Sequence, residues 1–227
     1  MTPSRRSLLA TVTALGTGAG LWLTAALAAK PAPLAAGWDH TIGRADAPVE
    51  LIEYASPVCG HCANWQATVW PRIKADFVDT GKVRYVFREL ATDPANIAFA
   101  TLLLARCSGT SEGYFSVIHD VMKGQKAMFS SGDARPVLFG AAEKAGLNEA
   151  RANACLTDAK ALETIQTRME ANASAFDITG TPAFVVNGTL LPRETFDYEA
   201  IAAAINTALK APAKPSDKAK RPLPRPR

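Results

Sequence analysis

The segment from residue 49 to 62 constrains the fold most, because an apolar, strand-like run leads directly into a Cys-Gly-His-Cys motif. The residues that follow, 63–77, carry apolar side chains at close to every fourth position, which is typical of one face of a helix. Cys59 is therefore expected at or next to a helix start. Trp65 and Trp70 on the apolar face are expected in the core. The sequence thus predicts a strand and a helix with two cysteines at their junction.

This position gives the two cysteines a chemical role. At a helix N-terminus, unpaired backbone N–H groups and the positive end of the helix dipole favour the thiolate, which is the reactive form of a thiol. Cys62 lies three residues after Cys59, so the two sulfurs can form a disulfide. His61 can add positive charge or a hydrogen bond to the thiolate, and Gly60 leaves Cys59 accessible to a substrate. The pair is predicted to alternate between dithiol and disulfide.

A Cys-x-x-Cys pair also occurs as half of a zinc site. Such a site needs a second closely spaced pair of ligands, but the other two cysteines stand singly, and His40 and His119 lie in unrelated segments. The strand-then-helix context therefore favours redox chemistry. Thiol–disulfide exchange needs no metal, nucleotide or flavin cofactor. A metal-binding module that uses the motif and a structural disulfide without turnover are the alternatives.

The N-terminal residues 1–29 are a predicted export signal. Arg5 and Arg6 precede a charge-free run, 7–29, that contains an Ala-Leu-Ala cleavage option. The run is also long enough to remain as an uncleaved inner-membrane anchor, and the arginine pair resembles a twin-arginine signal. After a linker at residues 30–36, the domain is expected in the periplasm or otherwise outside the cytoplasm, where disulfides persist.

Charge is distributed unevenly along the chain. Residues 37–210 carry 16 Lys and Arg against 20 Asp and Glu, whereas residues 211–227 carry 6 against 1. The mildly acidic domain argues against a nucleic-acid-binding surface. The basic, proline-rich tail is predicted to be disordered, because it has too little apolar area to fold. Weak attraction of this tail to anionic lipid is an alternative to simple solvation.

A carboxylate lies six residues before the first cysteine of the motif. Glu53 is either a polar residue on an exposed strand face or a buried carboxyl. A buried carboxyl has a raised pKa and can accept the proton that Cys62 must lose before it attacks a mixed disulfide. Residues 82–89 alternate polar and apolar side chains as a second strand, so residues 49–89 predict a βαβ unit with a right-handed crossover.

A helical insertion is predicted from about residue 92 to 176. Its segments have helix-period apolar residues and are separated by glycines; they are Ile97–Cys107, Tyr114–Phe129, Arg135–Ala145 and Glu149 to about Phe176. Cys107 and Cys155 both fall inside this insertion. They either remain free as small buried apolar residues or form a structural disulfide.

Strand patterns return after the insertion. Asn187-Gly188 between apolar runs is typical of a hairpin turn. Pro182 precedes the first of these runs, either as a trans proline that starts a strand or in a cis turn. A closing amphipathic helix is expected over residues 195–210, with Phe196 among its inner apolar residues.

The Cys59-Gly60-His61-Cys62 motif, the Gly180-Thr181-Pro182-Ala183-Phe184 loop and the insertion between them resemble the thioredoxin superfamily, and within it the DsbA-like exported thiol:disulfide oxidoreductases. The resemblance covers about residues 37–210. It implies an α/β thioredoxin-like fold with the helical insertion between a βαβ half and a ββα half. It also implies that Cys59 is the exposed nucleophile and that Cys62 is the buried resolving cysteine.

The same resemblance implies roles for other residues. Pro182 matches the family's cis-proline, which presents the backbone of the preceding Thr181 to a substrate strand. A carboxylate at the position of Glu53 recurs in DsbA proteins. Family members with cysteines in the helical unit often pair them, which favours a disulfide between Cys107 and Cys155.

The implied activity is the introduction of disulfides into unfolded or partly folded exported proteins with free thiols. Reoxidation by a membrane quinone-linked partner of the DsbB kind is implied as well, and the protein is expected to be a monomer. The Gly-His centre of the motif and Thr181 depart from the best-known DsbA enzymes. A reductase or isomerase of the same fold is therefore the alternative, and a redox potential near about −270 mV rather than above about −180 mV would favour it.

Overall fold

The computed structural model describes residues 38–211. The predicted export signal (1–29), the linker (30–36) and all but the first residue of the basic tail lie outside these described residues. None of the helices within the described part combines the length and the apolar character that a bilayer span requires.

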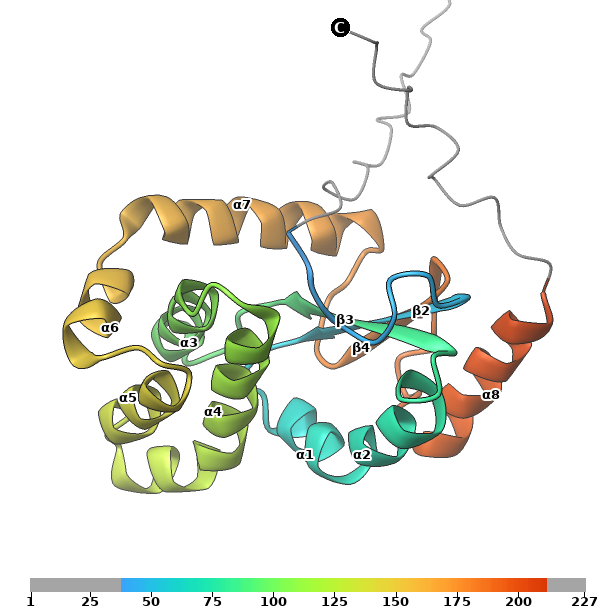
Figure 1. The fold of residues 1–227 in the computed structure, drawn as a ribbon, viewed down its shortest axis with the longest axis horizontal. Helices are drawn as coiled ribbons and strands as arrows, with labels where there is room; N and C mark the ends of the chain where they lie inside the picture. The colour runs from blue at the N-terminus through green and yellow to red at the C-terminus, as the bar shows by residue number, and fades with distance from the viewer. Residues whose placement is uncertain (1–37, 212–227) are drawn as a thin grey trace, which may run out of the picture.

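The described chain is built on one sheet of five strands in the order β1-β3-β2-β4-β5 (Figure 1). The parallel pair is β2 (Val49–Ala55) and β3 (Val83–Glu89). The strands antiparallel to a neighbour are β1 (His40–Ile42) beside β3, β4 (Ala183–Val186) beside β2, and β5 (Thr189–Leu190) beside β4. Helices cover both faces of the central strands, which explains why six of the seven residues of β2 are buried.

The helix after the motif and the last helix lie on one face of the sheet (Figure 1). The first of these is interrupted, as α1 (Gly60–Thr68), α2 (Trp70–Ile73) and a π-helical turn (Lys74–Val78). The proline at the start of α2 has no backbone N–H to continue the ladder from α1. The last helix, α8 (Tyr198–Lys210), packs against β2, β4 and α2.

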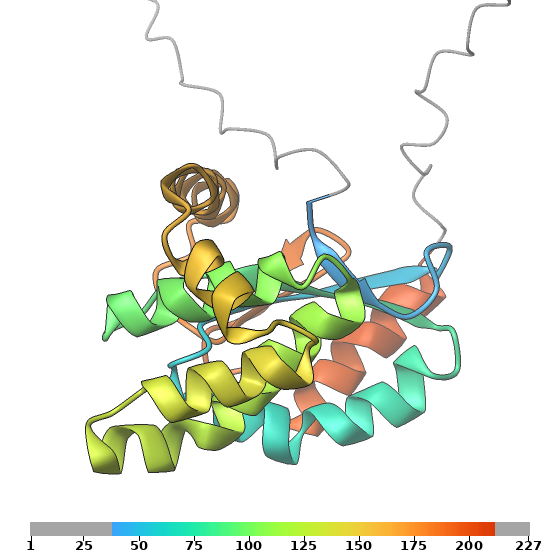
Figure 2. The same ribbon diagram turned by 60° about the vertical axis from the view of Figure 1, so that its left-hand side comes forward.

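Five helices fill the chain between the two halves of the sheet. They are α3 (Ala95–Cys107), α4 (Ser111–Ser131), α5 (Arg135–Lys144), α6 (Glu149–Leu156) and α7 (Ala159–Ala175). The first four form a helical unit at one end of the sheet, while α7 runs along the face opposite α1 and α8 (Figures 1 and 2). The predicted fold class, a thioredoxin-like α/β fold with a helical insertion, is confirmed.

Most buried apolar side chains form one core that joins the sheet to α1, α4 and α8. Trp65 and Trp70 are buried in it, as predicted. The predicted hairpin is present between β4 and β5, where Asn187 (φ 44°) and Gly188 (φ 79°) both take positive φ angles. Two consecutive positive φ angles are the signature of a type I′ turn, which Asn-Gly favours.

The sequence did not predict β1, because three residues are too few to show an alternating pattern. His40–Ile42 pairs with β3 instead of leading into a simple turn. The ring of His40 stacks on Tyr114 of α4, with ring centroids 3.9 Å apart. The first strand therefore connects the sheet to the helical unit.

The prediction of one long helix from Glu149 to about Phe176 is wrong, because the chain breaks between α6 and α7. The side chain of Asp158 accepts the backbone N–H of Ala161 at 2.9 Å and so caps a new helix. The break contains neither glycine nor proline, so a search for strong helix breakers could not find it.

The prediction for the closing helix is wrong at its start. The helix begins at Tyr198, where Asp197 accepts the backbone N–H of Ala200 at 2.7 Å. Phe196 therefore precedes the helix and is 37% exposed rather than on its inner side. Ile201 is buried against the sheet as expected.

Candidate active site

The motif lies at the junction of β2 and α1. β2 ends at Ala55, and after a short turn the backbone N–H of Cys59 donates to the carbonyl of Ser56 at 3.1 Å. Cys59 then acts as the N-cap of α1, and its Sγ accepts the backbone N–H of Cys62 at 3.2 Å. Both cysteines are free thiols in this structure. The sulfur of Cys59 therefore occupies the place that a side-chain oxygen usually takes at a helix start.

A loop distant in sequence forms the other side of the site. β4 pairs with β2 so that Ala183 lies opposite Tyr54, which brings the residues before β4 next to the motif. The Thr181–Pro182 peptide bond is cis. The thiol of Cys59 donates to the carbonyl oxygen of Thr181 across a distance of 3.7 Å. The sheet register thus brings the two segments together.

The two thiols differ strongly in acidity. The hydrogen bond from the Cys62 thiol lowers the pKa of Cys59 to about 6 against the opposing effect of burial. A hydrogen bond from the Thr181 side chain and the backbone N–H groups of Cys62 and His61 lower this pKa further. Burial, together with the hydrogen bond to Cys59 and the charge of Glu53, raises the pKa of Cys62 far above its usual range. At neutral pH the Cys59 sulfur is a thiolate and the Cys62 sulfur holds its proton.

Accessibility differs in the same direction. Cys59 is 9% exposed, whereas Cys62 is completely buried. Gly60 is exposed, and a Cβ added to it would meet no other atom within 4 Å, so the surface beside Cys59 is open. The side chain of His61 is also exposed, and the contribution of His61 to the acidity of Cys59 comes from its backbone N–H.

Glu53 lies in β2 beneath the motif and is completely buried, which excludes the exposed-strand alternative. Its Oε2 atom accepts hydrogen bonds from the Tyr85 hydroxyl at 2.5 Å and from the Gln66 amide at 2.6 Å. Its Oε1 atom has no hydrogen-bond partner among the described residues. Burial raises the pKa of Glu53 to about 8 against the effect of its two donors, and the charge of Cys59 raises it further.

Known proteins with a similar sequence or fold share the thioredoxin-like arrangement of this chain. A family model described as Thioredoxin matches residues 36–207. The chain belongs to the thioredoxin family.

Two relatives of this thioredoxin-family protein come from Rickettsia. A Rickettsia bellii protein named "Putative protein-disulfide oxidoreductase" is 32% identical over 173 residues, which cover 76% of this chain and 65% of the relative. A Rickettsia typhi protein of the same description is 30% identical and is covered over 62% of its length. The chain therefore matches slightly less than two thirds of the length of these relatives.

Among solved structures, the thioredoxin-family chain is similar to Wolbachia pipientis alpha-DsbA1, with a TM-score of 0.69 and 25% identity. That match covers 78% of this chain and 93% of the Wolbachia protein. Chlamydia trachomatis DsbA shares the fold at a TM-score of 0.66 and 21% identity. The protein is thus a DsbA-like member of the thioredoxin family.

The sequence analysis missed three polar residues of this thioredoxin-family site. Gln66 and Tyr85 hold the carboxyl of Glu53. The amide of Gln125, from α4, donates to the carbonyl oxygens of Pro57 at 2.9 Å and Cys59 at 3.2 Å. A glutamine on an amphipathic helix gives no signal that distinguishes such a contact from an exposed polar position.

The thioredoxin-family domain has a second pair of cysteines in its helical unit. Cys107, the last residue of α3, and Cys155, near the end of α6, form a disulfide with their Cα atoms 6.1 Å apart. This pair shares no element with the motif. It connects α3 to α6 through two cysteines that are 48 residues apart in sequence.

The remaining histidines lie away from the motif of this thioredoxin-family chain. His40 is on β1 against Tyr114, and His119 is on α4 beside Phe115. Within residues 38–211, no group of three or more His, Cys, Asp or Glu side chains is arranged to hold a metal ion.

Proposed function

We propose that this protein is a thiol:disulfide oxidoreductase that introduces disulfides into exported proteins through Cys59 and Cys62. The observation that carries the proposal is the asymmetry of the pair. Cys59 is acidic and partly accessible, whereas Cys62 is buried and keeps its proton. Such an arrangement gives one sulfur for exchange with a substrate and a second sulfur for resolution. The names of the Rickettsia and Wolbachia relatives support the same chemistry.

The reaction starts from the oxidised Cys59–Cys62 pair. A substrate thiolate attacks Sγ of Cys59, so that a mixed disulfide forms and Cys62 leaves with the electron pair and takes up a proton. A second substrate thiolate attacks the substrate sulfur of the mixed disulfide and releases Cys59 as a thiolate. The substrate gains one disulfide and loses two electrons, and the enzyme is left as the dithiol.

Stabilisation of the Cys59 thiolate sets the direction of this exchange. A low pKa makes Cys59 a good leaving group and favours the reduced enzyme over the oxidised one. The disulfide is correspondingly easy to reduce, which makes the protein an oxidant of other thiols. The carbonyl of Thr181 beside Pro182 supplies a backbone acceptor for the substrate strand during the mixed-disulfide stage.

Glu53 handles the proton of Cys62 in the proposed mechanism. Its charge is close enough to raise the pKa of Cys62, and its own pKa of about 8 lies near the working pH. A group with such a pKa can both take up and return a proton at neutral pH. Glu53 therefore carries the proton that Cys62 gains and loses as the disulfide opens and closes.

The proposal extends to the cellular context of the chain. Residues 1–29 export or anchor the protein, 30–36 form a linker to the domain at 37–210, and the basic tail follows. The protein works as a periplasmic monomer on proteins with free thiols and is reoxidised by a quinone-linked membrane partner of the DsbB kind. Its excess of acidic side chains over residues 37–210 supports protein substrates rather than nucleic acid.

The test is the redox potential of the motif, measured by equilibration with glutathione and mass-spectrometric mapping of both cysteine pairs. A value above about −180 mV is expected, and a value near about −270 mV would make the protein a reductase instead. Insulin-reduction and thiol-oxidation assays, each with and without a chelator, form a second arm. Failure of both assays together with tight zinc uptake would replace the redox function by metal binding.

A further inference from the structure

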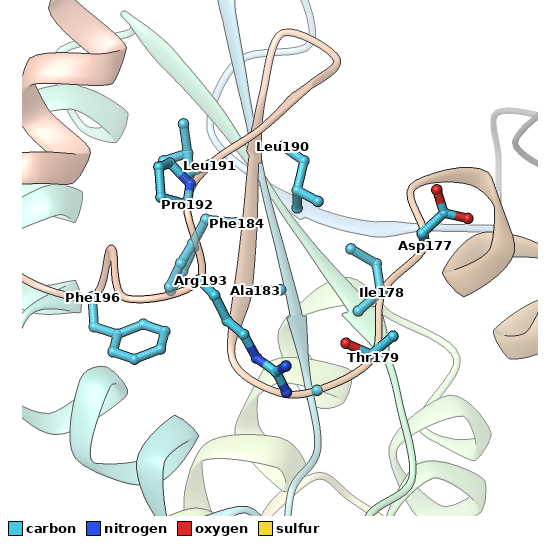
Figure 3. Close-up of a pocket in the computed structure, with 11 residues that line it drawn as sticks. Asp177, Ile178, Thr179, Ala183, Phe184, Leu190, Leu191, Pro192, Arg193 and Phe196 are labelled. Carbon is cyan, nitrogen blue, oxygen red and sulfur yellow. The ribbon is translucent and has the colours of Figure 1, made fainter.

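A small pocket of about 110 Å³ lies directly beside the Thr181–Pro182 loop (Figure 3). The segment before this loop forms one wall, and β4, β5 and the chain that follows β5 form the others. Leu190, Arg193 and Phe196 are among the side chains that line it. We call this surface the Arg193 pocket.

Arg193 places an exposed positive charge in this pocket. Its side chain is exposed, and within residues 38–211 its guanidinium makes no hydrogen bond or ion pair. Figure 3 shows the side chain extended toward the loop that carries Thr179. A Cβ placed on Gly180 would lie 2.6 Å from Nη2 of Arg193, so the guanidinium rests against the glycine backbone. A side chain at this position would have to displace the charge.

The charge therefore lies against the loop whose next residue contacts the reacting sulfur. Gly180 is bonded to Thr181, and the carbonyl oxygen of Thr181 is 3.7 Å from Sγ of Cys59. A strand advances about 3.3 Å per residue. A substrate segment whose cysteine reacts at Cys59 thus brings residues one or two positions away from that cysteine to the guanidinium.

Apolar side chains flank the charge. Among the described residues, three large apolar side chains are strongly exposed, and two of them, Leu190 (41%) and Phe196 (37%), line this pocket. Asp177, at the other end of the pocket, makes an interaction of its own. Because residues 37–210 carry more acidic than basic side chains, the surface as a whole repels an acidic segment, and Arg193 is a local exception.

We propose that the Arg193 pocket selects substrates that carry a carboxylate within two residues of the reacting cysteine, next to an apolar side chain. The proposal rests on the proposed function and names the substrate class of that site. A guanidinium binds a carboxylate through two parallel N–H donors, one to each carboxylate oxygen. An amide on the substrate offers only one acceptor oxygen, and a lysine offers none. Leu190 and Phe196 supply the apolar contact for the neighbouring side chain.

The experiment measures binding of short peptides to the full chain by NMR titration. Serine replaces the peptide cysteine so that no disulfide chemistry contributes. Matched peptides carry Glu, Gln or Lys two residues before or after the serine. A leucine stands next to this variable residue. The variants are Arg193→Ala and Arg193→Glu, and Arg151→Ala is the matched control because it removes one exposed positive charge from α6, away from the motif.

We expect the wild type and Arg151→Ala to bind a Glu peptide about twofold to fivefold more tightly than its Gln counterpart, as for an exposed ion pair. Arg193→Ala is expected to bind both equally, and Arg193→Glu is expected to prefer the Lys peptide. In the wild type and in Arg151→Ala, the Glu preference is expected to vanish as ionic strength rises. An equal Glu-to-Gln ratio in wild type and Arg193→Ala, or no binding of any peptide, would overturn the proposal.

A separate experiment distinguishes a failure of the charge selection from a failure of the oxidoreductase function. The oxidised protein is mixed with a dithiol peptide that has Gln in place of Glu, and the rate of peptide oxidation is measured. Failure to oxidise this neutral peptide contradicts the oxidoreductase function. Oxidation of it without any Arg193-dependent difference in binding contradicts only the selection by charge.

Discussion

The two cysteine pairs of this molecule occupy opposite ends of their helices. Cys59 caps the N-terminus of α1 with Cys62 in the first turn, where backbone N–H groups point at the sulfur. Cys107 is the last residue of α3 and Cys155 lies near the end of α6, where carbonyl groups and the negative end of the helix dipole disfavour a thiolate. The same side chain is thus activated at one helix end and is suited to a lasting crosslink at the other.

The largest expected effect separates the two pairs by activity. Cys59→Ser is expected to slow disulfide exchange by on the order of 10³-fold or more, because a serine hydroxyl does not ionise near neutral pH. The double variant Cys107→Ser/Cys155→Ser should keep the exchange rate within about threefold. A dithiol-peptide oxidation assay measures both. An equal loss of exchange rate in the two variants would contradict the assignment of one reactive and one structural cysteine pair.

Stability is expected to separate the pairs in the opposite direction. Removal of the Cys107–Cys155 disulfide, which spans 48 residues, should lower the free energy of unfolding by about 3–4 kcal/mol through loop entropy. Urea unfolding of the double variant measures this loss. Its Cys59 thiolate should still titrate near pH 6. A shifted titration would mean that the helical disulfide supports the motif directly.

Glu53 sharpens the comparison because it is a buried carboxyl beneath the motif that makes no ion pair among the described residues. The pKa of Glu53 is about 8 in the folded chain and about 4.3 in an unfolded one, so between these values the folded state holds the extra proton. Stability from this group is therefore greatest at low pH and is lost as pH rises toward 8. Glu53→Gln is therefore expected to be about 5 kcal/mol more stable than wild type at pH 9, and nearly equal to it at pH 4.

The same variant should slow the attack of Cys62 on a mixed disulfide by about tenfold or more, because the proton acceptor is lost. Stopped-flow measurement of this step between pH 6 and 9 reports the effect. In the wild type the rate should rise through a pKa near 8, and this inflection should be missing in Glu53→Gln. An unchanged pH profile would assign the proton transfer to water.

The smallest effect concerns the acidity of Cys59. The hydrogen bond from the Cys62 thiol is the largest cause of its lowered pKa. Cys62→Ala is therefore expected to raise the pKa of Cys59 by about one unit, or about 1.4 kcal/mol, whereas Cys62→Ser should raise it less because the hydroxyl still donates. Ultraviolet absorbance of the thiolate measures both. Identical titrations of the two variants would mean that the hydrogen bond from residue 62 does not contribute to the lowered pKa of Cys59.

Local pattern was sufficient for the features that depend on neighbours in sequence. The strand and helix around Cys59, the Asn187-Gly188 turn and the helical insertion follow from periodicity and turn chemistry. Contacts between distant polar residues did not follow, because a pattern along the chain does not encode them. Tyr85 on β3 reaches Glu53 and Gln66, and Gln125 on α4 reaches the backbone of the motif, only after the sheet and the helical unit have assembled.

The exact ends of elements were also difficult. The break between α6 and α7 depends on one side chain, that of Asp158, whose capping bond competes with continued helix. The pairing of β1 depends on the neighbouring β3 rather than on its own three residues.

The amide of Gln125 gives the helical unit a mechanical part in the chemistry. It fastens the carbonyl oxygens on either side of Val58 to α4. A displacement of the helical unit away from the sheet would therefore break one hydrogen bond to the backbone of Cys59 and one to that of Pro57, two residues before it. Through these bonds, the position of the helical unit and the backbone of the reacting cysteine are linked.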